Sequence, residues 1–185
     1  MNAFWRNDPL TTDEQKLLDL VLGAHAQSAL RDNVSTMALK YAAAGSDKIE
    51  AGVVAAISAL GGKHAPVTKI AEFLAKTPFV MLGIAEDHVM EGRAIPGWGN
   101  SFFKGRPDPD WAQVATIIDA WPDMAGKIDS VTDLLHSHGK HVFPNAGCYT
   151  AAAAIIVGMP IKLAPFLLLR GRLEVWCSLA LDQCK

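Results

Sequence analysis

Four residues directly before a predicted helix, Gly61, Gly62, Lys63 and His64, have types that could stabilise negative charge. Unpaired backbone N–H groups at such a helix start, together with the helix dipole, would suit an anion or a developing oxyanion beside the imidazole. A Gly-Gly helix end followed by an exposed polar turn explains the same residues. The local sequence favours this structural interpretation, because a single GGxH pattern is a weak indicator of a site.

A glycine-rich loop further along the chain could hold a ligand that carries a base and phosphates. It contains Ile95, Pro96, Gly97, Trp98, Gly99 and Asn100, followed by Lys104 and Arg106. Glycines let the backbone approach a ligand closely, an aromatic ring can stack on a base, and the cations can contact phosphates. A tight turn around a packed tryptophan fits these residues equally well.

Three histidines, His136, His138 and His141, lie close enough in the sequence to raise the question of a metal site. However, Gly139 breaks the helix between them, and no carboxylate or cysteine completes a ligand set. Residues two apart also do not share a helix face. We therefore predict a solvated helix end here, and no metal.

The elements that must position these segments are predicted to be helices. Alternation of β-branched residues is scarce and alanine is frequent, which favours an all-α fold. The first helix is expected to begin at a capping box formed by Thr12 and Gln15. Further helices are predicted over residues 37–44, 47–60, 66–74, 80–90, 108–121, 130–138, 146–157 and 163–183.

Several helix boundaries are predicted by single residues. Asp108 is expected to be an N-cap, followed by Pro109 at the first helical position. Asn145 is expected to cap the helix that follows it, and Pro122 is expected to end the helix that precedes it. Ser46 and Asp47 offer caps for the helix over residues 47–60.

Charge and composition exclude several classes of function. The net charge is −2, with 17 basic and 19 acidic residues in no long run, so neither nucleic acid nor a membrane is an expected partner. The longest apolar run, about 146–169, is interrupted by Gly158 and Pro160, which favours two buried helices over a membrane span. The three cysteines have no metal spacing and the N-terminus has no signal-peptide pattern, so a cytoplasmic location is expected.

Four segments match one known pattern in order and spacing. They are AAISALGGKHAPVTKIAEFL, IPGWGNSFFKGRPDPDW, KHVFPNAGCYTAAAAIIVGMP and APFLLLRGRLEVWCSLALDQ. The first resembles an alanine-rich helix that ends before a catalytic histidine. The second resembles a P-G-F-G-H loop with a D-P-R end, and the third a K-x-L-Y-P-N helix start. Together they resemble the C-terminal part of citrate synthases and citryl-CoA lyases, from about Leu17 onward.

This resemblance implies a citrate synthase-like helical fold, in which a small domain closes over coenzyme A. It also implies a homodimer. We expect a lead-in over residues 1–16 and one helical domain over residues 17–185, comprising the small domain and the adjoining large-domain helices. The expected small-molecule partner is an acyl-CoA, with the coenzyme A thioester held as substrate or ligand and no tightly bound cofactor.

The resemblance also assigns candidate catalytic residues. The family joins acetyl-CoA to oxaloacetate, or cleaves citryl-CoA, with one carboxylate base and two histidines. His64 takes the enol-stabilising position, Asn100 replaces the second histidine, and Arg172 matches a carboxylate-binding arginine. Gly147 stands where the base is expected, and Asp110 stands where another carboxylate-binding arginine is expected.

The residues expected to contact coenzyme A match the family pattern better than those expected to contact oxaloacetate. The residues expected to contact coenzyme A are Pro96, Gly97, Trp98, Gly99, Lys104, Lys140 and Asn145. Ser28 replaces an upstream histidine that contacts oxaloacetate. Asp108, Asp110 and Glu86 are candidates to replace the missing carboxylate.

Three functions stay open at this point. The chain could be an acyl-CoA carbon–carbon lyase or acyltransferase with an altered acid–base set. It could instead be a non-catalytic relative that binds coenzyme A thioesters or dimerises. The third alternative is a scaffold without a small ligand.

Overall fold

The computed structural model describes residues 5–31, 33–60 and 66–184, and this part of the chain is all-α, as predicted. Its helices are α1 (Thr12–Ala29), α2 (Val34–Ser46), α3 (Ile49–Ala59), α4 (Val67–Leu74), α5 (Pro78–Met90), α6 (Ala112–Ile118), α7 (Pro122–Ser137), α8 (Ala146–Ile156) and α9 (Pro165–Leu181). Two short 3₁₀ turns, Pro109–Trp111 and Ile161–Leu163, precede α6 and α9.

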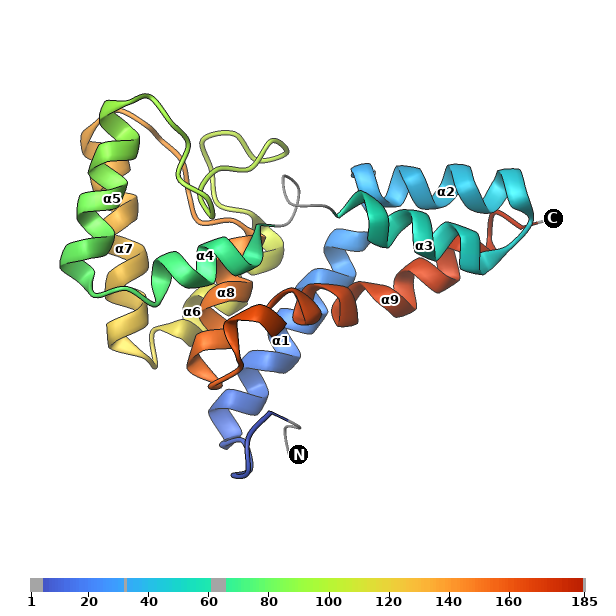
Figure 1. The fold of residues 1–185 in the computed structure, drawn as a ribbon, viewed down its shortest axis with the longest axis horizontal. Coiled ribbons are helices and arrows are strands. Elements are labelled where there is room, and N and C mark those ends of the chain that lie inside the picture. The colour runs from blue at the N-terminus through green and yellow to red at the C-terminus, as the bar shows by residue number, and fades with distance from the viewer. Residues whose placement is uncertain (1–4, 32, 61–65, 185) are drawn as a thin grey trace.

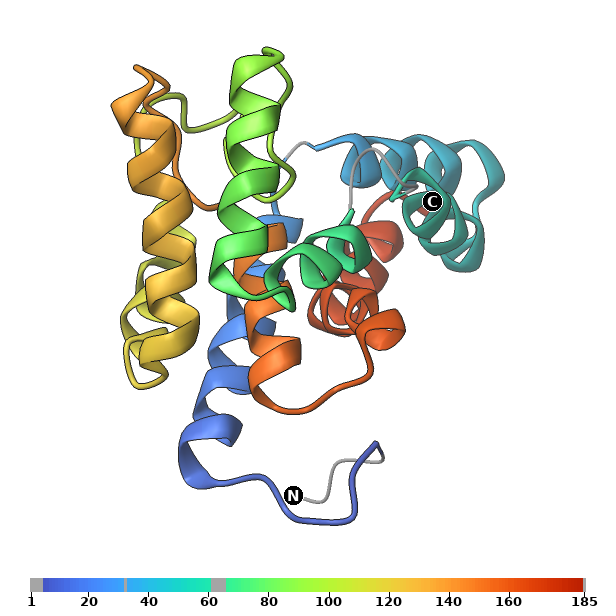
Figure 2. The same ribbon diagram turned by 60° about the vertical axis from the view of Figure 1, so that its left-hand side comes forward.

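Helices α1 and α9 pack against each other through the middle of the molecule (Figure 1). At one end, α2 and α3 form a hairpin against α9, over a small core of Leu39, Ala43, Ala56, Trp176 and Ala180. At the other end, α4–α8 surround the larger core, and Figure 2 shows α5 and α7 side by side there. The glycine-rich loop over residues 94–102 lies beside both groups, near the end of α1, the start of α2 and the first turn of α8.

Helices α1 and α9 approach each other closely at Gly171. A Cβ atom at this position would lie 2.6 Å from Cβ of His25 and 2.8 Å from the carbonyl oxygen of Leu22. Real Cβ atoms do not approach other atoms so closely, so only glycine fits. This glycine therefore fixes the position of the next residue, Arg172, against α1.

The cap of the first helix differs by one residue from the prediction. Thr11, and not Thr12, is the N-cap: its hydroxyl accepts from the Glu14 N–H at 3.2 Å, and Glu14 accepts from the Thr11 N–H at 2.7 Å. Glu14 also pairs with Arg6 at 2.9 Å. Hydrogen bonds to the charged carboxylate of Glu14 are stronger than those that a neutral Gln15 could make. Thr11 is therefore favoured over Thr12 as the N-cap.

Other boundaries follow the prediction in part. Asp108 and Asn145 cap their helices as expected. The helix predicted to run to Pro122 ends at Ile118, and the next one begins at Pro122 and not at residue 130, since proline is favourable at the first position of a helix. Asp47 adopts the left-handed conformation (φ 53°) that ends α2, and it does not cap α3. In the described part of the chain, no helix has the length and apolar character that crossing a membrane requires.

Candidate ligand-binding cavity

A cavity of about 570 Å³ lies where the two groups of helices meet. Its walls come from the end of α1, the start of α2, the loop over residues 94–102, the first turn of α8 and the middle of α9. Segments separated by more than 140 residues therefore share one site.

Most of the residues predicted from the sequence line this cavity. They are Pro96, Gly97, Trp98, Gly99, Asn100, Asn145 and Arg172, together with Ser28 and Gly147. Lys104 lines an adjoining cavity of about 260 Å³ with Arg106 and His141. Lys140 lines neither of the two, and His64 lies outside the described residues.

The glycine-rich loop is held by the segment over residues 143–145. Gly99 N–H donates to the carbonyl of Phe143 at 2.8 Å, and Asn145 N–H donates to that of Gly97 at 2.9 Å. Gly97 and Gly99 have φ values of 98° and 89°, a region in which side chains are strained. The glycines are thus needed for the loop itself, whatever it binds.

The side chain of Asn145 joins this loop to α8. Its amide donates to the carbonyl of Gly99 at 2.8 Å, and its oxygen accepts from the N–H groups of Gly147 and Cys148 at 2.9 and 3.3 Å. The carboxamide therefore fixes the wall of the cavity and caps the helix at the same time.

Trp98 packs into the core behind the loop. It is 7% exposed, its indole N–H donates to the Thr132 hydroxyl at 2.9 Å, and its ring meets Phe73 edge to face at 6.1 Å. Little of the ring is free, so it contributes a wall of the cavity more readily than a stacking face.

A polar network that the sequence did not indicate closes one side of the cavity. Arg31 donates from both terminal nitrogens to Asp108, at 3.1 and 3.2 Å, and also to Asp110. Asn100 donates to Asp108 at 3.1 Å, and the ring of Phe103 lies 4.7 Å from the guanidinium of Arg31. Asp108 is 5% exposed, so this pairing offsets the cost of burying its charge.

Arg172 lies in the same cavity without a carboxylate. Its Nε is buried and has no hydrogen-bond partner, and within the described ranges no ion pair reaches its guanidinium. Burial, reinforced by the positive charge of Arg31, lowers the pKa of Arg172 to about 10. The hydroxyl of Ser28, which is 6% exposed, is likewise buried and unpartnered at the cavity wall. Buried polar groups are ordinarily hydrogen-bonded, so two unsatisfied ones at one cavity call for an explanation.

His25 lies next to this pair, but not at the cavity wall. One ring nitrogen is 2.7 Å from the Thr150 hydroxyl, and the ring meets Trp111 edge to face at 4.8 Å. Burial, with Arg172 as a second cause, holds the pKa of His25 well below its ordinary value. A neutral His25 adds no positive charge beside Arg172.

A side chain at Gly147 would require the end of the Ile70 side chain to shift. A Cβ atom there would lie 2.8 Å from Cδ1 of Ile70. Of the proposed replacements, Asp108 lines the cavity but is ion-paired, Asp110 is ion-paired outside the wall, and Glu86 is exposed on α5. Among the residues that the structure describes, no unpaired carboxylate lines the cavity.

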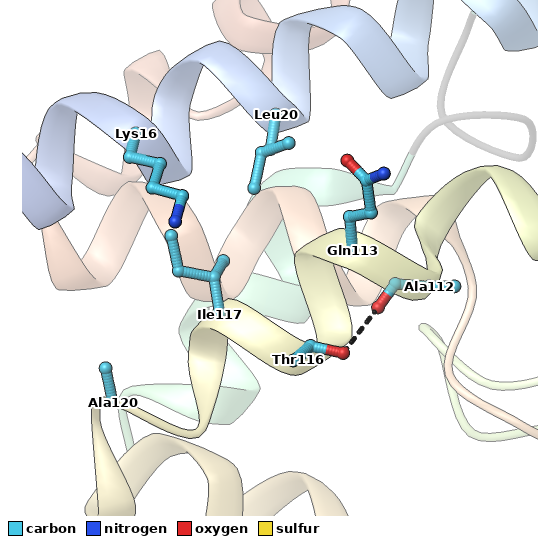
Figure 3. Close-up of a pocket in the computed structure, with 7 residues that line it drawn as sticks. All are labelled: Lys16, Leu20, Ala112, Gln113, Thr116, Ile117 and Ala120. Carbon is cyan, nitrogen blue, oxygen red and sulfur yellow. Dashed lines mark hydrogen bonds between the residues drawn. The ribbon is translucent and has the colours of Figure 1, made fainter.

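Two other features carry no predicted site residue. A more open groove of about 580 Å³ between α1 and α6 is lined by Lys16, Leu20, Ala112, Gln113, Thr116, Ile117 and Ala120 (Figure 3). Its walls are mostly apolar, with the Thr116 hydroxyl turned back to the Ala112 carbonyl at 3.1 Å. His136 and His141 lie 5.6 Å apart, yet no group of three or more metal-binding side chains occurs in the described part of the chain.

The helical fold, with a polar cavity behind a glycine-rich loop, defines an all-α protein with a candidate small-molecule site. The family model for the citrate synthase C-terminal domain matches residues 2–185, and the chain belongs to that family. This confirms the family indicated by the sequence segments.

Solved structures show the same fold at low sequence identity. Citryl-CoA lyase from Hydrogenobacter thermophilus matches with a TM-score of 0.78 and 17% identity, over 96% of this chain and 72% of that protein. Citrate synthase from Thermotoga maritima MSB8 matches with a TM-score of 0.76 and 18% identity, over 94% of this chain. The chain spans 50% of the length of that citrate synthase. No curated protein matches the chain.

Proposed function

We propose that the chain binds a coenzyme A thioester across the two adjoining cavities. The observation that carries the proposal is their shared wall: Gly99, Asn100 and Asp108 line both. The smaller cavity adds Lys104 and Arg106, which suit the phosphates of coenzyme A. The larger one contains the unpaired guanidinium of Arg172. Both structural neighbours bear the names of enzymes of this family, one of them a citryl-CoA lyase.

Binding without ordinary turnover fits the cavity better than carbon–carbon lyase or acyltransferase activity. The described wall offers no unpaired carboxylate, and losing a general base commonly costs a factor of 10² to 10⁴ in rate. Asn100 already donates to Asp108 and accepts from the Phe102 N–H at 2.9 Å, so it is occupied where a second histidine is expected. We therefore propose a coenzyme A-binding member of the family, with the enzymatic function as the alternative.

A thermal-shift titration with acetyl-CoA tests this proposal. At 100 times the dissociation constant a ligand adds about 2.7 kcal/mol, which corresponds to a rise in Tm of about 5–10 °C for this size. Lys104→Ala should reduce the shift, while Lys76→Ala, an exposed lysine away from both cavities, should leave it unchanged. Absence of any shift would contradict the proposal. Turnover of acetyl-CoA with oxaloacetate that His64→Ala abolishes would instead establish the enzymatic alternative.

We also propose that the chain forms a homodimer through the α2–α3 hairpin. Val34, Met37 and Tyr41 are exposed on α2 at positions i, i+3 and i+7, and Tyr41 is 87% exposed. Val54 and Ile57 are exposed on α3, so both helices of the hairpin present apolar side chains to solvent. Such faces commonly mark protein interfaces.

Light scattering of the wild type and two variants checks the dimer. Met37→Glu places a charge in this face and is expected to shift the protein to a monomer of 19.8 kDa. Phe79→Glu changes an 88% exposed side chain on α5 and should leave the assembly unchanged. A wild type that is monomeric at high concentration would rule the dimer out.

A further inference from the structure

The two arginines of the larger cavity differ in their partners. Arg31 makes a bidentate pair with Asp108 and a further contact, through Nη2, with Asp110. Arg172 has no carboxylate in the described ranges, and its Nε is buried without a partner. One guanidinium is thus occupied by the protein itself, and the other is left for a ligand.

The charges of these groups set what the cavity can hold. Arg31 contributes one positive charge while Asp108 and Asp110 contribute two negative charges, so this cluster carries a net charge of −1. Arg172, which lines the same cavity, contributes one positive charge that no carboxylate of the protein pairs with in the described ranges. A single carboxylate can pair with Arg172. A second carboxylate that reached Arg31 would meet two carboxylates already bound there, which is strongly unfavourable away from water.

We propose that the cavity selects ligands with one carboxylate, held by Arg172 and Ser28, and that Asp110 excludes ligands with a second one. This inference rests on the proposed function, because it names the class of acid that accompanies the coenzyme A thioester in the same cavity. Asp110 does not line the cavity. It acts indirectly, by placing a second negative charge beside Arg31.

Asp110, and not Asp108, is the residue that can be changed without dismantling the wall. Asp108 accepts from both terminal nitrogens of Arg31, from Asn100 and from the N–H of Asp110 at 3.1 Å. Asp110 makes the single additional contact to Arg31. Replacing Asp110 by asparagine keeps the bidentate pair and brings the charge of the cluster to zero.

The test compares lactate with malate, which is lactate with one more carboxylate, by ligand-observed NMR titration. The wild type is expected to bind lactate at least tenfold more tightly than malate. In Asp110→Asn this preference should fall about tenfold. Asp110→Glu keeps the charge and should restore the wild-type preference, which a purely structural role of Asp110 does not predict. Circular dichroism of each variant establishes that it is folded.

The outcomes separate this inference from the proposed function when acetyl-CoA is titrated into the same samples. Equal preference in the wild type and Asp110→Asn, or a wild type that prefers malate, would overturn the inference even if acetyl-CoA binds. So would acetyl-CoA binding with no binding of either acid. A lactate preference that Asp110→Asn removes, without any acetyl-CoA binding, would leave the anion site standing and refute the coenzyme A proposal.

Discussion

Replacing Arg172 by methionine is expected to make the protein more stable while removing its affinity for carboxylates. Nε of Arg172 is buried without a partner and no carboxylate pairs with the guanidinium in the described ranges, and taking a charge out of water in this way costs free energy. Methionine has a similar length, no charge, and a thioether that packs well against the ring of Trp176, which lies 5.9 Å from the guanidinium. We expect the free energy of unfolding to rise by about 1–3 kcal/mol.

The direction of this change follows from the pKa. The folded state lowers the pKa of Arg172 to about 10 from its ordinary value of 12.5, so it disfavours the charged form. The cost is therefore present at every pH below the folded-state pKa and is relieved only as the pH rises through it. At neutral pH the whole cost is in place, and stability from this group should not vary with pH there.

Urea denaturation measures the expected rise in the free energy of unfolding, and lactate titration measures the expected loss of affinity for carboxylates. Arg170→Met is the matched control, because Arg170 lies on the same helix and is exposed. That variant should stay within about 0.5 kcal/mol of the wild type and keep its lactate affinity. A destabilised Arg172→Met protein would mean that the arginine supports the fold, and would count against a charge kept for binding.

The sequence predicted the residues that form the cavity better than the contacts among them. Asn145, Gly97 and Gly99 were identifiable because a helix cap and a left-handed backbone each demand particular residue types within a few positions. The pairing of Arg31 with Asp108 joins residues 77 apart, and no spacing rule links them. From the sequence, Asp110 stood where a carboxylate-binding arginine was expected, and it was a candidate for the missing base. The structure places it against Arg31, so its negative charge acts by occupying a guanidinium.

Some local sequence patterns fit two structures equally well, and only contacts with distant residues decide between the two. Thr11 with Glu14 and Thr12 with Gln15 both satisfy the capping-box pattern, and the position of Arg6 beside Glu14 favours the first. Trp98 could have stacked on a ligand or packed in the core. The Thr132 hydroxyl and the Phe73 ring decide this, and both come from distant helices.

Gly171→Ala is expected to lower the free energy of unfolding by about 1–3 kcal/mol, while Gly126→Ala should raise it by about 0.5–1 kcal/mol. Both substitutions add one methyl group to a helix interior, and both gain helix propensity. At Gly126, on the exposed side of α7, the methyl group meets nothing within 4 Å. At Gly171 it meets the Cβ of His25 and the backbone of Leu22, which cannot move aside like the end of a flexible side chain.

The opposite signs of these two effects make urea denaturation decisive, since propensity alone would stabilise both variants. Gly171 also precedes Arg172, so separating α1 from α9 should move the guanidinium away from Ser28 and weaken lactate binding in the same variant. Gly126→Ala should leave that binding unchanged. If Gly171→Ala were as stable as the wild type, the close contact between α1 and α9 would not exist in solution.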